Sequence, residues 1–251
     1  MRPVVKSVKD KTSGHYRPWR KAKIDLVNEI GSFCSYCEKQ IDRSSLHIEH
    51  IKGQKVRNKE GGLIYDDLKF DWNNFLLACS NCNSIKSNKD IALTNPYLPH
   101  QNNLLHFIEI TAAGTVGIKA NVTESDLIKT KAFIDLVGLD RHPGHPHYAE
   151  FGDDRWESRL ATIDIANRQL KKYKATPRET DLENIVNLAK GWGFFSVWYY
   201  QFYSHPEVLD ALINGIATEA KHIIPFKGTH AGSFEAPSFN TIERNPSTQQ
   251  R

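Results

Sequence analysis

The chain has 251 residues, a formal net charge of +4, and 39% apolar and 25% charged residues. This composition excludes an intrinsically disordered chain, and no run of 18 apolar residues offers a membrane-spanning helix. The first 23 residues contain a charged stretch but no apolar signal-peptide core. We therefore expect a folded cytoplasmic protein with no membrane partner.

The N-terminal region, residues 1–33, is predicted to be a basic arm that leads into a helix. Its first 23 residues hold eight Lys or Arg against one acidic residue. The helix is expected at about residues 18–30, with Gly31 as its cap. A basic terminus is either a solvated end or a phosphate contact, and the sequence leaves both readings open. The candidate nucleic-acid contacts in this arm are Arg17, Arg20 and Lys21.

The four cysteines form two C-x-x-C pairs, Cys34 with Cys37 and Cys79 with Cys82. Four thiolates in two pairs suit a tetrahedral zinc ion, and a disulfide framework is unusual in a reducing cytoplasm. Buried thiols or a redox pair are the alternative, but neither explains why every cysteine falls into such a pair. Because four Cys ligands close the coordination shell, we expect this zinc to stabilise the fold without catalysing a reaction.

A strand and a long loop are predicted between the two cysteine pairs. The stretch LHIEHI alternates apolar and polar residues, which is the period of a strand and places His47 and Glu49 on one face. An irregular loop rich in Gly and Lys follows. The apolar run FLLA then leads into the second pair and a short helix. Zinc would therefore join both ends of one compact unit, residues 34–92.

These motifs resemble the HNH nucleases, which belong to the ββα-metal, or His-Me finger, endonucleases. The resemblance rests on C-x-x-C, then I-E-H-I, then N-F-L-L-A-C-x-x-C-N-x-x-K. It implies a zinc-stabilised ββα-metal finger within an α+β fold, and hydrolysis of nucleic acid, with DNA as the first expectation. The residue roles implied by the family are a general base at His50, ligands of a catalytic Mg²⁺ or another divalent cation at Glu49 and Asn83, and a central asparagine at Asn74 rather than Asn73.

The residue types at these positions suit phosphodiester hydrolysis. A neutral imidazole such as that of His50 has an ordinary pKa near 6.5 and can take a proton from water near neutral pH. Carboxylate and amide oxygens suit Mg²⁺, and Asn74 would orient the imidazole through the loop that follows it. His47 either contacts phosphate or metal-bound water, or makes a supporting hydrogen bond. Lys86 and Lys89 are expected on an exposed helix face that meets phosphate or is simply solvated.

Residues 93–225 are predicted to form a β-hairpin and a mainly helical bundle. Strands at about 105–111 and 115–120 would turn at Gly114, and a capped helix is expected over 123–138. Further helices should pack together through apolar stripes, one of them formed by Trp156, Leu160, Ile163 and Leu170. The aromatic-rich segment 192–203 is expected in the centre of this bundle, with a partner interface or base stacking as alternatives. Residues 226–251 are predicted to be a mobile tail.

A wider resemblance covers about residues 1–175. The order of MRPVVK, HIEH, the NPYLP…LLHFIEITAAGTV hairpin and KAFIDLVGLDRH is similar to the HNH subunit of the Septu anti-phage system, which also occurs with some retrons. This resemblance implies an antiviral defence role and an ABC-type ATPase partner encoded alongside. The sequence shows no P-loop, so any ATP-dependent control is expected to come from another chain. The alternative is a zinc-dependent nucleic-acid-binding or adaptor protein that does not cut.

Overall fold

The structure is a computed structural model that describes residues 1–148, 152–217 and 222–229. It combines helices with small antiparallel sheets, as the expected α+β class requires. Its first part contains η1 (Trp19–Lys21), α1 (Ala22–Ile30), β1 (His47–His50), η2 (Asp66–Leu68), η3 (Trp72–Asn74), β2 (Phe75–Ala78), α2 (Ser80–Lys86) and α3 (Ile91–Thr94). The remainder contains η4 (Leu104–His106), β3 (Ile108–Ile110), β4 (Val116–Ile118), α4 (Glu124–Val137), α5 (Arg155–Ala175), α6 (Glu179–Trp192), α7 (Phe195–Gln201), α8 (Pro206–Asn214), β5 (Ile216–Ala217) and β6 (His222–Ile223).

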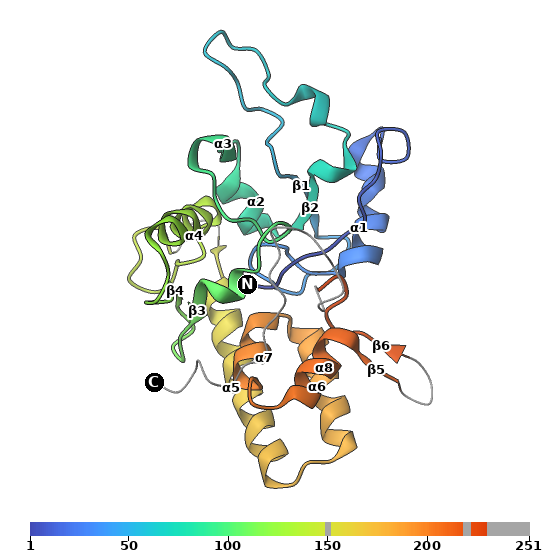
Figure 1. Cartoon of the computed structure of the whole chain (residues 1–251), viewed down its shortest axis with the longest axis vertical. Helices are drawn as coiled ribbons and strands as arrows, with labels where there is room; N and C mark the ends of the chain where they lie inside the picture. The colour runs from blue at the N-terminus through green and yellow to red at the C-terminus, as the bar shows by residue number, and fades with distance from the viewer. Residues whose placement is uncertain (149–151, 218–221, 230–251) are drawn as a thin grey trace.

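The first part forms a finger in which β1 and β2 pair antiparallel and α2 packs against β1. The register places His47 opposite Ala78 and His50 opposite Phe75. All four residues of β2 are buried, because this apolar strand lies between α1 and the rest of the core. The chain between β1 and β2 extends away from the body as a long loop (Figure 1). The finger therefore has the element order that the sequence predicts.

The N-terminal helix is confirmed, but the first residues of the chain are not a solvated arm. A 3₁₀ turn and α1 together cover residues 19–30, and Gly31 ends α1 with a φ of 79°. Met1, Arg2 and Val4 are each about 1% exposed. The Arg2 guanidinium donates to the Lys227 carbonyl at 2.8 Å. Residues 1–4 are thus buried, Val5 and Lys6 are half-buried, and the exposed basic stretch begins after them.

The predicted hairpin and the helix after it are confirmed, with shorter strands than expected. Strands β3 and β4 pair antiparallel, and Gly114 in their turn has a φ of 75°. At the start of α4, the Thr123 side chain accepts a hydrogen bond from the backbone of Asp126. Gly138 ends the same helix in the left-handed conformation. Packing of α4 against α2 holds the hairpin segment on the finger.

Helices α5 to α8 gather at the opposite end of the molecule from the long loop (Figure 1). Their core is aromatic: Phe195, Trp198 and Phe202 are each fully buried, which supports the core-packing prediction for segment 192–203. Phe226, at the start of the predicted tail, is also 1% exposed and packs against Phe195 with ring centroids 5.1 Å apart. The tail therefore cannot begin at 226, and residues 230–251 lie outside the described part of the chain.

The predicted apolar stripe of α5 is confirmed for Ile163 and Leu170, which pack in the helical core, but Trp156 and Leu160 do not join that core. Ile163 is buried, whereas Trp156, Leu160 and Leu170 are only half-buried. Two arginines, Arg155 and Arg159, lie on the buried face instead and are 3% and 1% exposed. This end of α5 packs on hydrogen-bond acceptors, including the Gly114 carbonyl, which accepts from Arg159 Nε at 2.6 Å. Buried acceptors require donors, so the face is polar as well as apolar.

The loop of the first cysteine pair joins the finger to the helical end. Glu38 is 1% exposed and adopts a φ of 68°. Its carbonyl accepts from the Phe194 backbone at 2.9 Å, and its carboxylate accepts from the Ser196 hydroxyl at 2.7 Å.

None of the helices among the described residues combines the length and apolarity needed to cross a membrane.

Candidate active site and zinc centre

The four cysteines converge at one end of the finger. All four are buried, and their sulfur atoms lie within 4.8 Å of one another. The Sγ atoms of Cys37 and Cys79 are 3.7 Å apart, close to the edge of about 3.8 Å expected for a tetrahedron with zinc–sulfur bonds of about 2.3 Å. Hydrogen bonds from the neighbouring thiols lower the pKa of Cys79, whereas burial raises the pKa of Cys37. The cluster fits a structural zinc ion.

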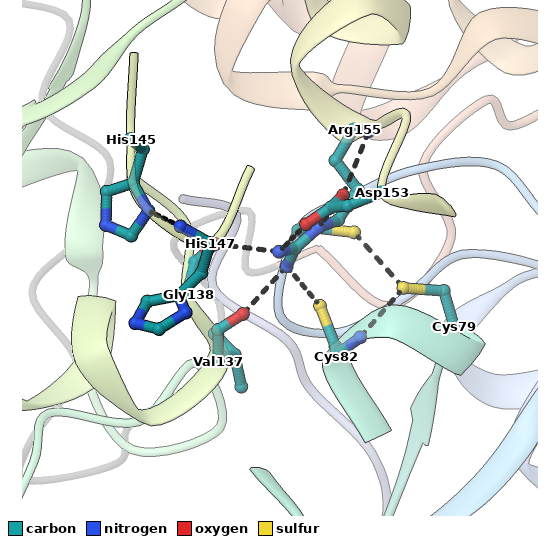
Figure 2. Close-up of polar contacts among 9 residues, drawn as sticks. Cys79, Cys82, Val137, Gly138, His145, His147, Asp153 and Arg155 are labelled. Carbon is teal, nitrogen blue, oxygen red and sulfur yellow. Dashed lines mark hydrogen bonds and ion pairs between the residues drawn. The ribbon is translucent and has the colours of Figure 1, made fainter. Parts of the chain in front are cut away.

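A guanidinium from the helical end contacts this cluster (Figure 2). Arg155, the first residue of α5, donates from Nη1 to Cys82 Sγ at 3.1 Å and to the Val137 carbonyl at 2.8 Å. Its Nη2 donates to the Gly138 carbonyl at 2.7 Å, and Asp153 forms a buried ion pair with it. Four thiolates around Zn²⁺ carry a net charge of about −2, so a buried cation beside Cys82 offsets part of that charge.

Three of the four predicted catalytic residues line one cleft at the other end of α2, and Asn74 is not among its lining residues. The cleft has a volume of about 320 Å³ and is lined by His50, Glu49 and Asn83, among others. His50 and Glu49 are the last two residues of β1, and Asn83 lies in the middle of α2. Strand alternation sends Glu49 and His47 toward α2, where they contact Lys86 and Ser80 respectively. The shared face of these two residues is confirmed.

The contacts of His50 define how its imidazole can act. Nε2 lies 3.0 Å from the Lys69 carbonyl, which can only accept, so we assign the ring proton to Nε2. Nδ1 then carries the lone pair and can accept from the Gln54 side-chain nitrogen at 3.1 Å. The same nitrogen lies 2.6 Å from Nε2, but only a proton on Nε2 gives both the Lys69 carbonyl and the Gln54 amide a hydrogen-bond partner. Burial lowers the pKa of His50 from its ordinary value, although the hydrogen bond to Lys69 opposes this change. The imidazole is therefore neutral near pH 7, the form that accepts a proton.

Asn74 clamps the loop that follows His50. Its Oδ1 accepts from the Lys52 backbone nitrogen at 2.8 Å, and its Nδ2 donates to the Lys52 carbonyl at 3.1 Å. The same Nδ2 lies 3.3 Å from the Leu68 carbonyl, one residue before Lys69. Asn73 instead exchanges hydrogen bonds with the backbone of Lys9. Of the two asparagines, only Asn74 is in contact with the segments that hold the imidazole.

Glu49 and Lys86 form a buried ion pair, and this corrects the prediction for Lys86. The Lys86 side chain is 1% exposed, and its ammonium lies 2.5 Å from Glu49 Oε1. It also donates to the His50 carbonyl at 2.9 Å. The second Glu49 oxygen accepts from the buried Tyr36 hydroxyl. Lys86 is therefore inside the finger, where it cannot meet phosphate on a surface.

The oxygen atoms that line the cleft are chemically suited to bind a hard divalent cation. Glu49 and Asn83 both line this space and supply carboxylate and amide oxygens. An ionised carboxylate has about four lone-pair positions, so hydrogen bonds from Lys86 and Tyr36 leave capacity on Glu49. The Lys86 ammonium nevertheless offsets the charge of the carboxylate, which weakens its attraction for a cation.

The other predicted nucleic-acid-binding residues fall into two groups, one beside the cleft and one in contact with α4. Arg17, Arg20 and Lys21 are exposed around η1, and the neighbouring Trp19 packs edge-on against His50 with centroids 5.4 Å apart. Lys89 donates instead to the carbonyls of Asp135 and Leu136 at the end of α4, at 2.9 and 3.2 Å. Lys89 is exposed, but its ammonium is engaged with the end of α4.

Sequence reasoning missed several residues that shape the cleft. Gln54 contacts the imidazole, Trp19 walls the cleft, and Tyr36 holds Glu49. Lys69 acts only through its backbone, so its side-chain type gives no signal. Tyr36 lies inside the first C-x-x-C pair and Gln54 four residues after His50, and those positions were the available clues.

Comparison with known proteins supports the finger assignment. The sequence model of the family HNH endonuclease matches residues 34–89, the segment that contains both cysteine pairs and every residue of the predicted catalytic set. No significant match to a curated protein was found. The match covers the finger and leaves the hairpin and the helical end without a family assignment.

Proposed function

We propose that this chain is a metal-dependent HNH endonuclease that hydrolyses phosphodiester bonds of nucleic acid, with DNA as the expected substrate. The observation that carries the proposal is the convergence of His50, Glu49 and Asn83 on one cleft within the segment that matches the family. The four-cysteine cluster lies at the far end of the same finger, where it supports the fold.

In this proposal the residues of the cleft have separate roles. His50 accepts a proton from the attacking water at Nδ1, after the Gln54 amide gives up its contact. Asn74 keeps the backbone on both sides of the imidazole in place. Glu49 and Asn83 would hold Mg²⁺ or a similar cation, which when bound neutralises charge on the phosphate.

The alternative function is a zinc-dependent nucleic-acid-binding or adaptor protein that does not cut. One observation favours it: both oxygens of Glu49 are engaged, by Lys86 and by Tyr36. If Glu49 serves only as half of a buried ion pair, the cleft lacks its carboxylate ligand. The two functions differ in whether cleavage depends on a divalent cation and on His50.

The deciding experiment is cleavage of plasmid DNA, single-stranded DNA and RNA by the purified zinc-loaded protein. We expect cleavage with Mg²⁺, none with chelator, and a fall of about 10²-fold or more in His50→Ala, which is the contribution of a general base. Retained zinc content and an unchanged thermal transition in His50→Ala would show that the fold is intact. Equal cleavage by both proteins, or none by the wild type with its partner present, would favour the adaptor.

A role in antiviral defence and an ABC-type ATPase partner stay predictions from the resemblance to the Septu system. Copurification of the chain with the product of a neighbouring ATPase gene would test the partner. The cleavage assay should therefore be run with and without that product, because a nuclease controlled by a second subunit is silent alone.

A further inference from the structure

A second cleft adjoins the candidate active site. It has a volume of about 440 Å³ and shares two walls, Trp19 and Ile48, with the catalytic cleft. Its remaining walls come from η1, α1, the segment before β1 and the first residue of α2. The polar residues that line it are Arg20, Lys23, Ser44, Ser45, His47 and Ser80.

The charged residues that line the two clefts favour binding of an anionic ligand. No carboxylate lines the second cleft among the described residues, whereas Arg20 and Lys23 contribute two cations. In the catalytic cleft the one acidic lining residue, Glu49, is already paired with Lys86. Lys55 adds a further cation on the catalytic side. The two clefts together form a continuous positive surface that attracts a chain of phosphates.

Local contacts hold the donors of the second cleft in place. The Arg20 guanidinium carbon lies 4.6 Å from the centre of the Trp19 ring, an arrangement that orients the guanidinium. The Lys23 ammonium donates to the Ser44 carbonyl at 2.9 Å, which uses one of its three protons. His47 Nε2 lies 3.2 Å from the Ser80 hydroxyl. N–H donors on Arg20 and Lys23 remain for a phosphate.

We propose that the second cleft binds the phosphate that neighbours the scissile phosphate on the same strand. The inference rests on the proposed function, which places the scissile phosphate beside His50. Trp19 and Ile48 then stand between two successive phosphate positions, and a strand lying across both clefts continues past the active site in each direction. Such contacts fix the position of the strand without reading its sequence.

Two nucleotides that differ by one phosphate test the proposal without any cleavage. Binding of thymidine 5′-monophosphate and thymidine 3′,5′-bisphosphate to the zinc-loaded wild-type protein is measured by calorimetry with Mg²⁺ present. We expect the bisphosphate to bind about tenfold more tightly, the value of one charge-assisted hydrogen-bonding site. In Arg20→Gln and Lys23→Gln this advantage should fall to less than about threefold.

The matched control is Lys171→Gln, which removes one exposed charge from α5 at the other end of the molecule. It should keep the full advantage of the bisphosphate. Arg20→Lys retains the charge and should keep most of it, which separates loss of charge from loss of fold. An equal advantage in the wild type and in both Gln variants, or no advantage in the wild type, would overturn the proposed phosphate site.

The outcome is separable from that of the cleavage assay. His50-dependent cleavage without a bisphosphate advantage would leave the endonuclease in place and remove only the second phosphate site. A bisphosphate advantage without cleavage would retain the site as a nucleic-acid contact of the adaptor protein. The salt dependence of DNA binding gives an independent readout, because losing one phosphate contact lowers the slope by about 1.

Discussion

The two ends of α2 each place a buried cation against an anionic group, but the cations come from different places. At the zinc end, the guanidinium of Arg155 reaches Cys82 from the start of α5, 73 residues along the chain. At the cleft end, Lys86 belongs to α2 itself and pairs with Glu49 of the adjacent strand. The zinc end therefore depends on the docking of the helical region, whereas the cleft end is completed within the finger.

Because of this difference, docking of the helical region bears on the zinc cluster, whereas the cleft depends on contacts within the finger. Arg155 also binds the carbonyls that end α4, so three segments meet at the zinc cluster. The Lys86 ammonium binds the end of β1, through Glu49 and the His50 carbonyl. Disturbing the helical region should first affect metal retention, and disturbing Lys86 should first affect the geometry of the cleft.

The largest effect is expected from removing a zinc ligand. Cys82→Ser should release the metal and cost at least about 4 kcal/mol, because loss of a metal site is among the most destabilising single changes. Metal analysis and urea unfolding with and without chelator measure this, and wild-type protein should contain one zinc per chain. A zinc-free variant with wild-type stability would contradict the structural role of the cluster.

Removing the cation at the cleft end should cost about 3–5 kcal/mol, because Lys86→Met leaves the Glu49 carboxylate buried without its partner. The double variant Lys86→Met with Glu49→Gln removes both charges and should recover a large part of that loss. Urea unfolding of the four proteins of this cycle gives the coupling energy. Additive losses would show that the pair is not coupled.

A milder change at the zinc end sharpens the comparison. Arg155→Lys keeps the positive charge but loses the fork that serves Cys82 and two carbonyls, so about 1–3 kcal/mol should be lost. Zinc transfer to a chelator should accelerate by about tenfold or more. The Lys86→Met protein, measured in the same way, should release zinc more slowly than Arg155→Lys, and the reverse order would contradict the assignment of the two ends.

The smallest effect is expected just beyond the cleft end. Lys89→Met removes a cation from the carbonyls that end α4, a contact worth about 0.3–1 kcal/mol. Because that ammonium is engaged by α4, affinity for DNA should stay within about twofold of wild type. Anisotropy titration checks this, with Arg20→Gln as the variant that should weaken binding.

The finger was largely predictable because its chemistry is local in sequence. The spacing of the cysteines predicted the zinc cluster, and the period-2 alternation predicted β1. The order of the motifs predicted that His50 and Asn83 belong to one compact unit. The burial of Lys86 could also have been predicted from the sequence. Cys82 must face the zinc inside the fold, and a residue four positions later lies on the same helix face, so Lys86 should point inward with it.

The buried arginines of α5 could not be predicted in the same way. Arg155 and Arg159 share a helix face with Ile163, but a hydrophobic pattern assigns charged residues to solvent. Their partners are a cysteine sulfur and backbone carbonyls from segments distant in the sequence. Every residue has a backbone carbonyl, so no sequence motif indicates which carbonyls accept these hydrogen bonds. The burial of the first four residues was missed for the same reason, since Arg2 donates to the carbonyls of Lys227 and Ile30.

The long loop between β1 and β2 divides the zinc ligands between two lengths of chain. Cys34 and Cys37 precede it, and Cys79 and Cys82 follow it. Its tip near Gly61 is exposed, and a side chain added at that glycine would begin in open space. A break in the chain at this tip would leave one C-x-x-C pair on each fragment. Reassociation of the fragments would restore the shared metal ion and the β1–β2 ladder, together with contacts such as that of Glu38 with Ser196. Because the metal ligands would then be divided between the fragments, the finger suits a split protein whose complementation depends on zinc.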